Sequence, residues 1–171
     1  MRQLLIFMIV LAAAAVPAFA QKSGGAAKIT PADEVRKAFE TMMDGIRQSD
    51  AEKVMGVYDK NDRILFFNNN GSVTAGWDQM LENRKSSYAK AKNVTLDITG
   101  LRVEMLSPTS AYVTCKWKQT QEFEGKPEGA SGRMTLVFKK IGKEWKAVHA
   151  HTSPDNPPPA RPVMPSERDS Q

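Results

Sequence analysis

Long stretches of alternating apolar and polar residues fill the second half of the chain and constrain its fold more than any other feature. Between residues 94 and 105 the apolar positions lie first on one parity and then on the other: Val94, Leu96 and Ile98, followed by Leu101, Val103 and Met105. Because successive side chains of a strand point to opposite faces, the change of phase at Thr99-Gly100 predicts a β-bulge that bends the strand. Three more strands are expected at about residues 111–123, 131–140 and 144–152.

The first half of the chain carries helical patterns instead. Thr30-Pro31-Ala32-Asp33 predicts the start of a helix, since threonine caps it, proline suits the first turn and an acid favours its positive end. Apolar residues then recur at helical spacing along one stripe: Val35, Phe39, Met42 and Ile46. Ser49-Asp50-Ala51-Glu52 has the form of a capping box and predicts a second, short helix that runs through Tyr58.

A hairpin and a third helix are expected between these helices and the long strands. Residues 63–67 predict a strand, Asn68-Asn69-Asn70-Gly71 a turn, and residues 72–75 the returning strand. The third helix is expected at about residues 77–90. Helices followed by a bent, mostly antiparallel sheet predict an α+β fold. In this fold the sheet wraps around three N-terminal helices and leaves a cone with one open end.

The N-terminus predicts a signal peptide. Arg2 is followed by an unbroken apolar run from Leu4 to Val16, and Ala18-Phe19-Ala20 supplies the small residues that a signal peptidase reads. The alternative is a retained membrane anchor, but the run is shorter than the ~20 residues that span a bilayer. Residues 1–20 are therefore expected to direct export to the periplasm or beyond, and no membrane association is expected after cleavage.

The segments that flank the folded unit have the composition of flexible chain. Residues 21–29 read as a flexible leader. Residues 154–171 hold six of the ten prolines and almost nothing large and apolar, so they cannot bury enough surface to offset their ordering entropy. A disordered, proline-rich tail is expected there, and the folded domain is expected at residues 30–153.

The charge and cysteine content exclude several classes of protein. The chain has 24 basic and 19 acidic residues, with no Lys/Arg block of the kind that marks a nucleic-acid tract, so no nucleic-acid partner is expected. Cys115 is the single cysteine; it cannot form an internal disulfide, and its apolar alternation predicts a buried thiol. No glycine-rich phosphate loop or zinc-ligand cysteine set is present, so neither a cofactor nor a metal is expected.

The closing strands resemble those of a known family. The segment GRMTLVFKKIGKEWKAVHAHTS, residues 132–153, resembles the end of the SnoaL-like branch of the nuclear transport factor 2-like superfamily, an ending that the association domain of calcium/calmodulin-dependent protein kinase II shares. The hairpin segment YDKNDRILFFNNNGSVTAGW, residues 58–77, agrees with it. The resemblance covers residues 31–153 and implies a cone-shaped fold, a homodimer and a pocket that serves many different functions in different members.

The two histidines are the first candidates for chemistry. His149 and His151 lie two residues apart, so a strand would present both imidazoles on one face. They could act as a general acid/base pair, or they could be structural polar residues at the cone mouth or in a dimer contact. A zinc site needs three or more protein ligands, and no third histidine exists. The sequence does not decide which face of the sheet the two histidines occupy. A two-residue loop at Ile141-Gly142-Lys143 would place them on one face and a three-residue loop on the other.

Arg84 is the most suggestive charge in the sequence. It falls on the apolar stripe of the third predicted helix, where a guanidinium could present a fork of donors to a carboxylate. The alternative is an arginine whose stem packs at the edge of the stripe and whose head stays in water. The full set of predicted ligand-binding residues is Tyr58, Trp77, Arg84, Tyr88, Trp117, Arg133, His149 and His151.

Three functions fit these observations. The first is a small-molecule-binding module with a cone-shaped pocket, exported and homodimeric. The second is an isomerase, cyclase or hydratase in which His149, His151 or Asp62 moves protons. The third is an interaction module that assembles through its sheet. Because the sequence shows no well-placed base for catalysis, the small-molecule-binding module is favoured.

Overall fold

The computed structural model describes residues 28–155. The predicted signal peptide, most of the predicted leader and the tail from residue 156 lie outside the described residues. In chain order the helices and strands are α1 (Pro31–Arg47), α2 (Ala51–Met55), β1 (Leu65–Phe67), β2 (Val73–Ala75), α3 (Trp77–Tyr88), β3 (Ala91–Ser107), β4 (Ser110–Phe123), β5 (Lys126–Ile141) and β6 (Glu144–Pro154). None of the helices in this part of the chain is long and apolar enough to cross a membrane.

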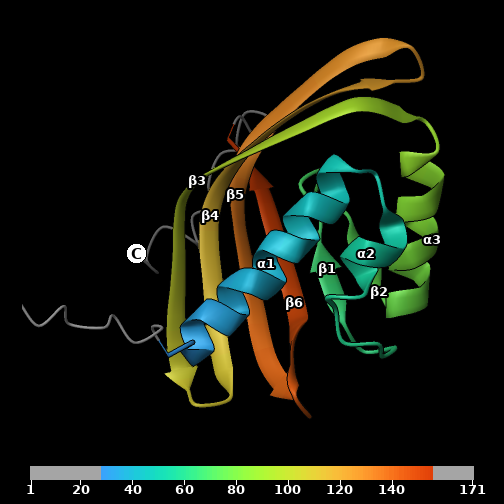
Figure 1. Ribbon diagram of the computed structural model, residues 1–171. Coiled ribbons are helices and arrows are strands. Elements are labelled where there is room, and N and C mark those ends of the chain that lie inside the picture. The colour runs from blue at the N-terminus through green and yellow to red at the C-terminus, as the bar shows by residue number, and fades with distance from the viewer. Residues whose placement is uncertain (1–27, 156–171) are drawn as a thin grey trace, which may run out of the picture.

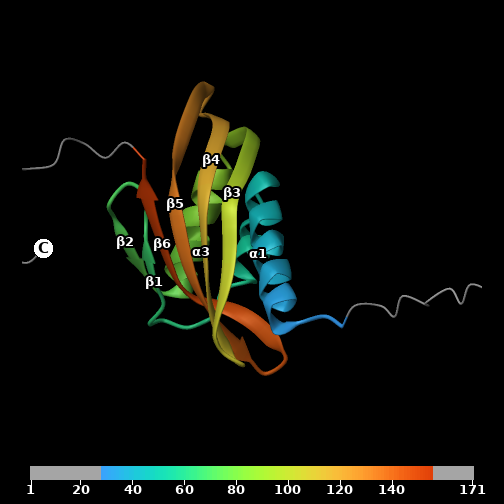
Figure 2. The same ribbon diagram turned by 90° about the vertical axis from the view of Figure 1, so that its left-hand side faces the viewer.

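The strands form one curled sheet in the order β2-β1-β6-β5-β4-β3. Neighbouring strands are antiparallel except β1 and β6, which run parallel. Helix α1 lies across the concave face, and α3 stands opposite the long strands, below the end of the β4–β5 hairpin (Figures 1 and 2). The predicted α+β fold, with helices packed against a strongly bent sheet, is confirmed.

The predicted bulge in the first long strand is present. Thr99 of β3 pairs with Lys116 of β4, and the next pair along is Arg102 with Thr114, so β3 holds one residue more than β4 over this stretch. Gly100 lies there with φ +63°, a left-handed conformation that side chains rarely adopt. An extra residue in one strand bends it and increases its twist, and this bend curls the sheet over α1.

Helix α1 fills the concave face as its pattern predicts. Thr30 caps the helix and forms a capping box with Asp33. The predicted stripe is buried: Val35, Phe39, Met42 and Ile46. Each such side chain contributes roughly 1.5–3 kcal/mol relative to an exposed one, so α1 anchors the core.

Helix α2 differs from the prediction in its cap and its length. Asp50, and not Ser49, is the capping residue, since its side chain accepts a hydrogen bond from the backbone N–H of Lys53. Ser49 has φ +53° and belongs to the turn that ends α1. The helix ends at Met55 instead of continuing through Tyr58, because the following residues bridge to β6: Tyr58 pairs in parallel with Ala147.

A charged contact ties the start of α1 to the β5–β6 hairpin. Glu34 Oε2 accepts hydrogen bonds from Lys140 Nζ at 2.8 Å and from Trp145 Nε1 at 2.9 Å. Hydrogen bonds from Lys140 and Trp145 lower the pKa of the Glu34 carboxyl below its ordinary value of 4.5, against a smaller opposing effect of burial. The ionised carboxylate therefore joins elements that are far apart in the sequence.

We expect this contact to make stability depend on pH. Because the pKa of Glu34 is lower in the folded state, its contribution is present above pH ~4.5 and is lost as the pH falls through the folded value. Glu34→Gln should therefore lower the melting temperature at pH 7, and the difference from wild type should shrink toward pH 3. Thermal unfolding followed by circular dichroism measures this.

Glu40→Gln is the matched control, because Glu40 is exposed on the same helix. Its melting temperature should follow that of wild type at both pH values. An equal deficit of Glu34→Gln at pH 7 and pH 3 would show that the charge of the carboxylate is not the cause.

Candidate functional site

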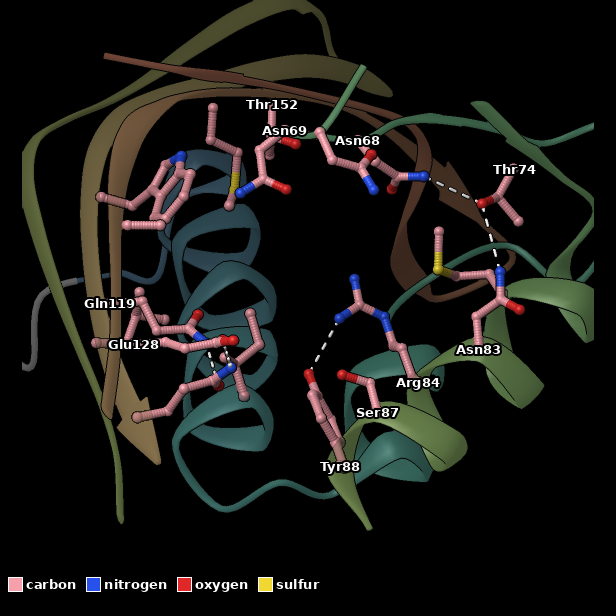
Figure 3. Close-up of a pocket in the computed structure, with 18 of the residues that line it drawn as sticks. Asn68, Asn69, Thr74, Asn83, Arg84, Ser87, Tyr88, Gln119, Glu128 and Thr152 are labelled. Carbon is pink, nitrogen blue, oxygen red and sulfur yellow. Dashed lines mark hydrogen bonds between the residues drawn. The ribbon is translucent and has the colours of Figure 1, made fainter. Parts of the chain in front are cut away.

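A cavity of about 680 Å³ lies between α3, the β1–β2 turn and the concave face of the long strands (Figure 3). Its sheet wall has an apolar part, with Leu96, Trp117 and Met134 next to Ile46 of α1, and a polar part at the β4–β5 hairpin, with Gln119, Gln121 and Glu128. Its helix wall is polar and consists of Asn83, Arg84, Ser87 and Tyr88 with Met80. A volume of this size, with an apolar surface between polar groups, suits a small organic molecule.

A glycine on β5 makes room for the indole of Trp117. Gly132 pairs with Trp117 across β4 and β5, and a Cβ at Gly132 would collide with the carbonyl oxygen of Ser153 and stand 3.0 Å from the indole. Trp117 Nε1 donates to the carbonyl oxygen of Arg133 at 3.3 Å, which satisfies its polar end. The indole is thus fixed on the concave side as a flat part of the cavity wall.

Arg84 extends from α3 into the cavity, on the side across from Gln119 and Glu128 (Figure 3). Its Nη1 donates to the hydroxyl oxygen of Tyr88, one helical turn along, at 3.0 Å. Its Nε is sealed from solvent and has no hydrogen-bond partner. Buried polar groups in proteins almost always have partners, so a charged donor without one is an exceptional feature.

In the described part of the chain, no anionic side chain balances the charge of Arg84. Burial lowers the pKa of Arg84, but Tyr88 and Tyr58 together outweigh it, and the pKa lies above its ordinary value. Burial raises the pKa of Tyr58, so at neutral pH this phenol offers a dipole and no charge. Within residues 28–155 no carboxylate forms an ion pair with Arg84. The cavity therefore contains a cation that remains charged and uncompensated.

The β1–β2 turn contributes consecutive asparagines, Asn68, Asn69 and Asn70, to the cavity wall. Asn68 Nδ2 donates to Thr74 Oγ1 at 3.1 Å, and Asn70 Oδ1 accepts from the backbone N–H of Ser72 at 3.0 Å. These bonds hold the turn in place beside α3. The sequence predicts the turn but not its role at the site, although a run of amides next to a polar helix is a signal that could have indicated it.

Three of the predicted ligand-binding residues line the cavity: Arg84, Tyr88 and Trp117. Tyr58 lies behind the guanidinium, buried against Phe66 at a ring distance of 4.9 Å. Trp77 is also buried, and its Nε1 donates to the carbonyl oxygen of Met55 at 2.9 Å. Tyr58 and Trp77 therefore support the cavity from the core instead of lining it.

Two other predicted residues lie away from the cavity. Arg133 is on the outer face of β5, where its guanidinium lies 3.5 Å from the carboxylate of Asp155. Its neighbours Gly132 and Met134 occupy the opposite face, so the alternation of the strand places Arg133 outside. Asp62 is exposed in the loop before β1. Asp62, a proton-transfer candidate, is not among the residues that line the cavity.

The loop between β5 and β6 has two residues, Gly142 and Lys143, because Ile141 pairs with Glu144. This answers the loop-length question that the sequence leaves open. Continued without interruption, the register would pair His149 with an inward-facing residue of β5 and direct the imidazole toward the cavity.

A bulge in β6 reverses that outcome. Phe138 pairs with Ala147, but the next pair is Val137 with His149, so Val148 is an extra residue in β6. Before Val148 the odd-numbered side chains of β6 face inward, and after it the even-numbered side chains do. Ala150 is buried and Thr152 lines the cavity, whereas the histidines face outward.

On the outer face both imidazoles contact one phenylalanine of β1. The ring of Phe67 lies 5.3 Å from that of His149 and 5.7 Å from that of His151, edge to face in both cases. Neither histidine lines the cavity. The structure therefore places these two candidate acid/base residues on the outer face of the sheet, which resolves the orientation that the sequence leaves open.

The cavity offers few groups for chemistry. Its ionisable lining residues are Arg84, Tyr88 and Glu128, and Glu128 is exposed. Cys115 is buried in the core, and burial raises the pKa of its thiol to about 11, so it stays protonated at neutral pH. Among the described residues no group of three His, Cys, Asp or Glu side chains could hold a metal ion.

Solved structures with the same fold come from several bacteria. A nuclear transport factor 2-like superfamily protein from Salmonella enterica is 19% identical, with 78% of this chain and 96% of that chain covered and a TM-score of 0.68. A proposed dehydratase of the same family from Streptomyces avermitilis is 18% identical, with 74% and 96% covered and a TM-score of 0.66. A proposed calcium/calmodulin dependent protein kinase II association domain from Xanthomonas campestris is 22% identical, with 80% and 95% covered and a TM-score of 0.60.

At these identities the solved structures establish the fold alone. No curated protein matches the chain. The family model of the SnoaL-like domain matches residues 35–157, which include most of α1, the cavity and all strands of the sheet. The chain therefore belongs to the SnoaL-like domain family.

Proposed function

We propose that this protein is an exported binding protein for a small organic anion, in which Arg84 holds a carboxylate of the ligand. The observation that carries the proposal is the charged guanidinium in the cavity, with a sealed Nε and no anionic partner among the described residues. A bound carboxylate would supply the missing negative charge and accept charge-assisted hydrogen bonds. Tyr88, whose oxygen accepts from Arg84, keeps its own proton free to donate to the same anion.

The remaining walls agree with a ligand that is acidic at one end and apolar elsewhere. Trp117 and Met134 face α3 across the cavity and offer apolar contact area. The asparagines of the β1–β2 turn offer neutral donors and acceptors that fix orientation. Specific binding of small molecules generally combines such an apolar surface with a few placed polar groups.

Binding accounts for the site better than catalysis does. The isomerase, cyclase or hydratase alternative needs a group that moves protons, and His149, His151 and Asp62 do not line the cavity. Glu128 is the one carboxylate among the lining residues, and it is exposed. A fold shared with a proposed dehydratase and a proposed association domain does not choose between these functions.

Export is supported by the sequence of the N-terminus. The apolar run from Leu4 to Val16 and the small residues at Ala18 and Ala20 have the organisation of a cleaved signal peptide. A protein in the periplasm or outside the cell would meet small acids directly. The expected mature chain begins at Gln21.

We expect Arg84→Gln to weaken the binding of benzoate at least about tenfold, because a charge-assisted contact contributes more than a neutral one. The affinity for benzamide, its neutral isostere, should change little. Titration calorimetry with the purified protein measures both. Lys85→Gln is the control, because it removes a neighbouring positive charge on the exposed side of α3. Equal benzoate affinities of Arg84→Gln and wild type would refute the proposal.

We also expect Arg84 to lower the stability of the protein when no ligand is bound. Replacing Arg84 with methionine removes an uncompensated charge while keeping a long side chain, so the free energy of unfolding should rise by about 1 kcal/mol. This corresponds to a melting temperature higher by about 3 °C for a domain of this size. Differential scanning calorimetry without ligand tests it. A large decrease for Arg84→Met would mean that the guanidinium holds the fold together through its tyrosine neighbours.

A second candidate function, self-association through the outer face of the sheet, is favoured by exposed apolar side chains there. Leu65, Phe67 and Val73 are 40%, 39% and 55% exposed. Phe67 pairs with Val73 on one side and with His151 on the other, so these side chains lie on the same face. A two-fold contact through this face would cover them and give the predicted homodimer.

Light scattering coupled to size exclusion tests the association. At micromolar concentration the wild type should have twice the chain mass, and Phe67→Glu should reduce it to the mass of one chain. Leu106→Glu is the control, since Leu106 is 63% exposed at the far end of β3. A wild-type monomer, or the same loss of dimer in both variants, would contradict association through this face.

A further inference from the structure

The cavity has a second charged wall, opposite Arg84. Glu128 of β5 lines the cavity from the β4–β5 hairpin, on the side across from α3 (Figure 3). It pairs with Gln121 of β4, so the two side chains lie next to each other on the same face of the hairpin. The sequence analysis predicted residues 124–130 as the connection between two strands and did not identify Glu128 as a site residue.

A chain of hydrogen bonds holds the carboxylate of Glu128 at this wall. Gln119 Nε2 donates to Gln121 Oε1 at 2.9 Å, and Gln121 Nε2 donates to Glu128 Oε2 at 3.2 Å. All three side chains line the cavity. Within residues 28–155 Glu128 forms no ion pair, so its charge is also uncompensated.

The α3 wall and the hairpin wall therefore favour ligand groups of opposite charge. The α3 wall, with Arg84 and Tyr88, offers donors and positive charge. The hairpin wall ends in the carboxylate of Glu128, which offers oxygen acceptors. A second carboxylate on the ligand would be repelled there, and an ammonium group would be attracted. The apolar surface of Trp117 and Met134 lies between these poles.

We propose that the ligand is an amino acid in the broad chemical sense: an apolar or aromatic body that carries a carboxylate toward Arg84 and an ammonium group toward Glu128. This inference rests on the proposed function, because it adds a second pole to the same cavity. Arg84 provides most of the affinity, since its guanidinium is the more buried of the two charges. Glu128 provides selectivity, because an exposed carboxylate attracts an ammonium group only weakly.

Three para-substituted benzoates test the inference by calorimetry at pH 7 and low salt. They are 4-(aminomethyl)benzoate, which has the ammonium group, 4-methylbenzoate, which has a neutral group, and terephthalate, which has a second carboxylate. Wild type should bind them in that order of decreasing affinity. Glu128→Gln should weaken binding of 4-(aminomethyl)benzoate about two- to fivefold, as expected for an exposed charge pair, and should leave 4-methylbenzoate unchanged.

Glu124→Gln is the matched control, because it removes the same charge from the same hairpin at a position outside the cavity lining. It should bind all three probes as wild type does. Equal wild-type affinities for the amino and methyl probes, or an equal loss for both in Glu128→Gln, would overturn the bipolar ligand while leaving the role of Arg84 intact. Binding of none of the three probes by wild type would overturn both proposals.

Discussion

The cavity depends on the bend of the long strands. A flat sheet would contact α1 along a line and would leave α3 on a separate surface, with no enclosed space between them. The extra residue near Gly100 of β3 curls the sheet until its concave face covers the apolar stripe of α1. Beyond that contact, the end of the β4–β5 hairpin lies over α3 (Figure 1). The cavity is the space that this overhang encloses.

Within that space Arg84 is the most informative residue. Its guanidinium is sealed at Nε and has no anionic neighbour among residues 28–155, so the burial of its charge opposes folding, and the hydrogen bond from Nη1 to Tyr88 offsets only part of that cost. Its tyrosine neighbours keep Arg84 charged but do not neutralise it. The surrounding core, with α1 packed under the sheet, is what allows the fold to tolerate this cost. Such a separation between a stabilising core and a strained site is typical of proteins that bind small molecules.

The sequence predicts most of the fold because its periodicities are clear. The stripe of α1 and the phase change at Thr99-Gly100 each have one structural interpretation, and both are confirmed. The site is predicted only where a residue contrasts with its neighbours, as Arg84 does on α3. Asn69 and Glu128 could not be found in this way, because a turn and a glycine-rich connection do not reveal which surface they will approach. The bulge at Val148 was hidden for another reason: Ala147, Val148 and Ala150 are all small and apolar, so the exchange of faces leaves no mark in the pattern.

That bulge also has an evolutionary consequence. Deletion of Val148 would remove the extra residue and leave Val137 paired with His149, so both imidazoles would stay on the outer face. If Val148 instead paired with Val137, His149 would pair with Leu136 and turn inward, and Thr152 would turn outward. A shift of strand pairing by one residue, with no change of sequence length, would thus place an imidazole in a cavity that has none among its lining residues. Relatives should therefore be compared by their strand pairing as well as by the positions of their histidines.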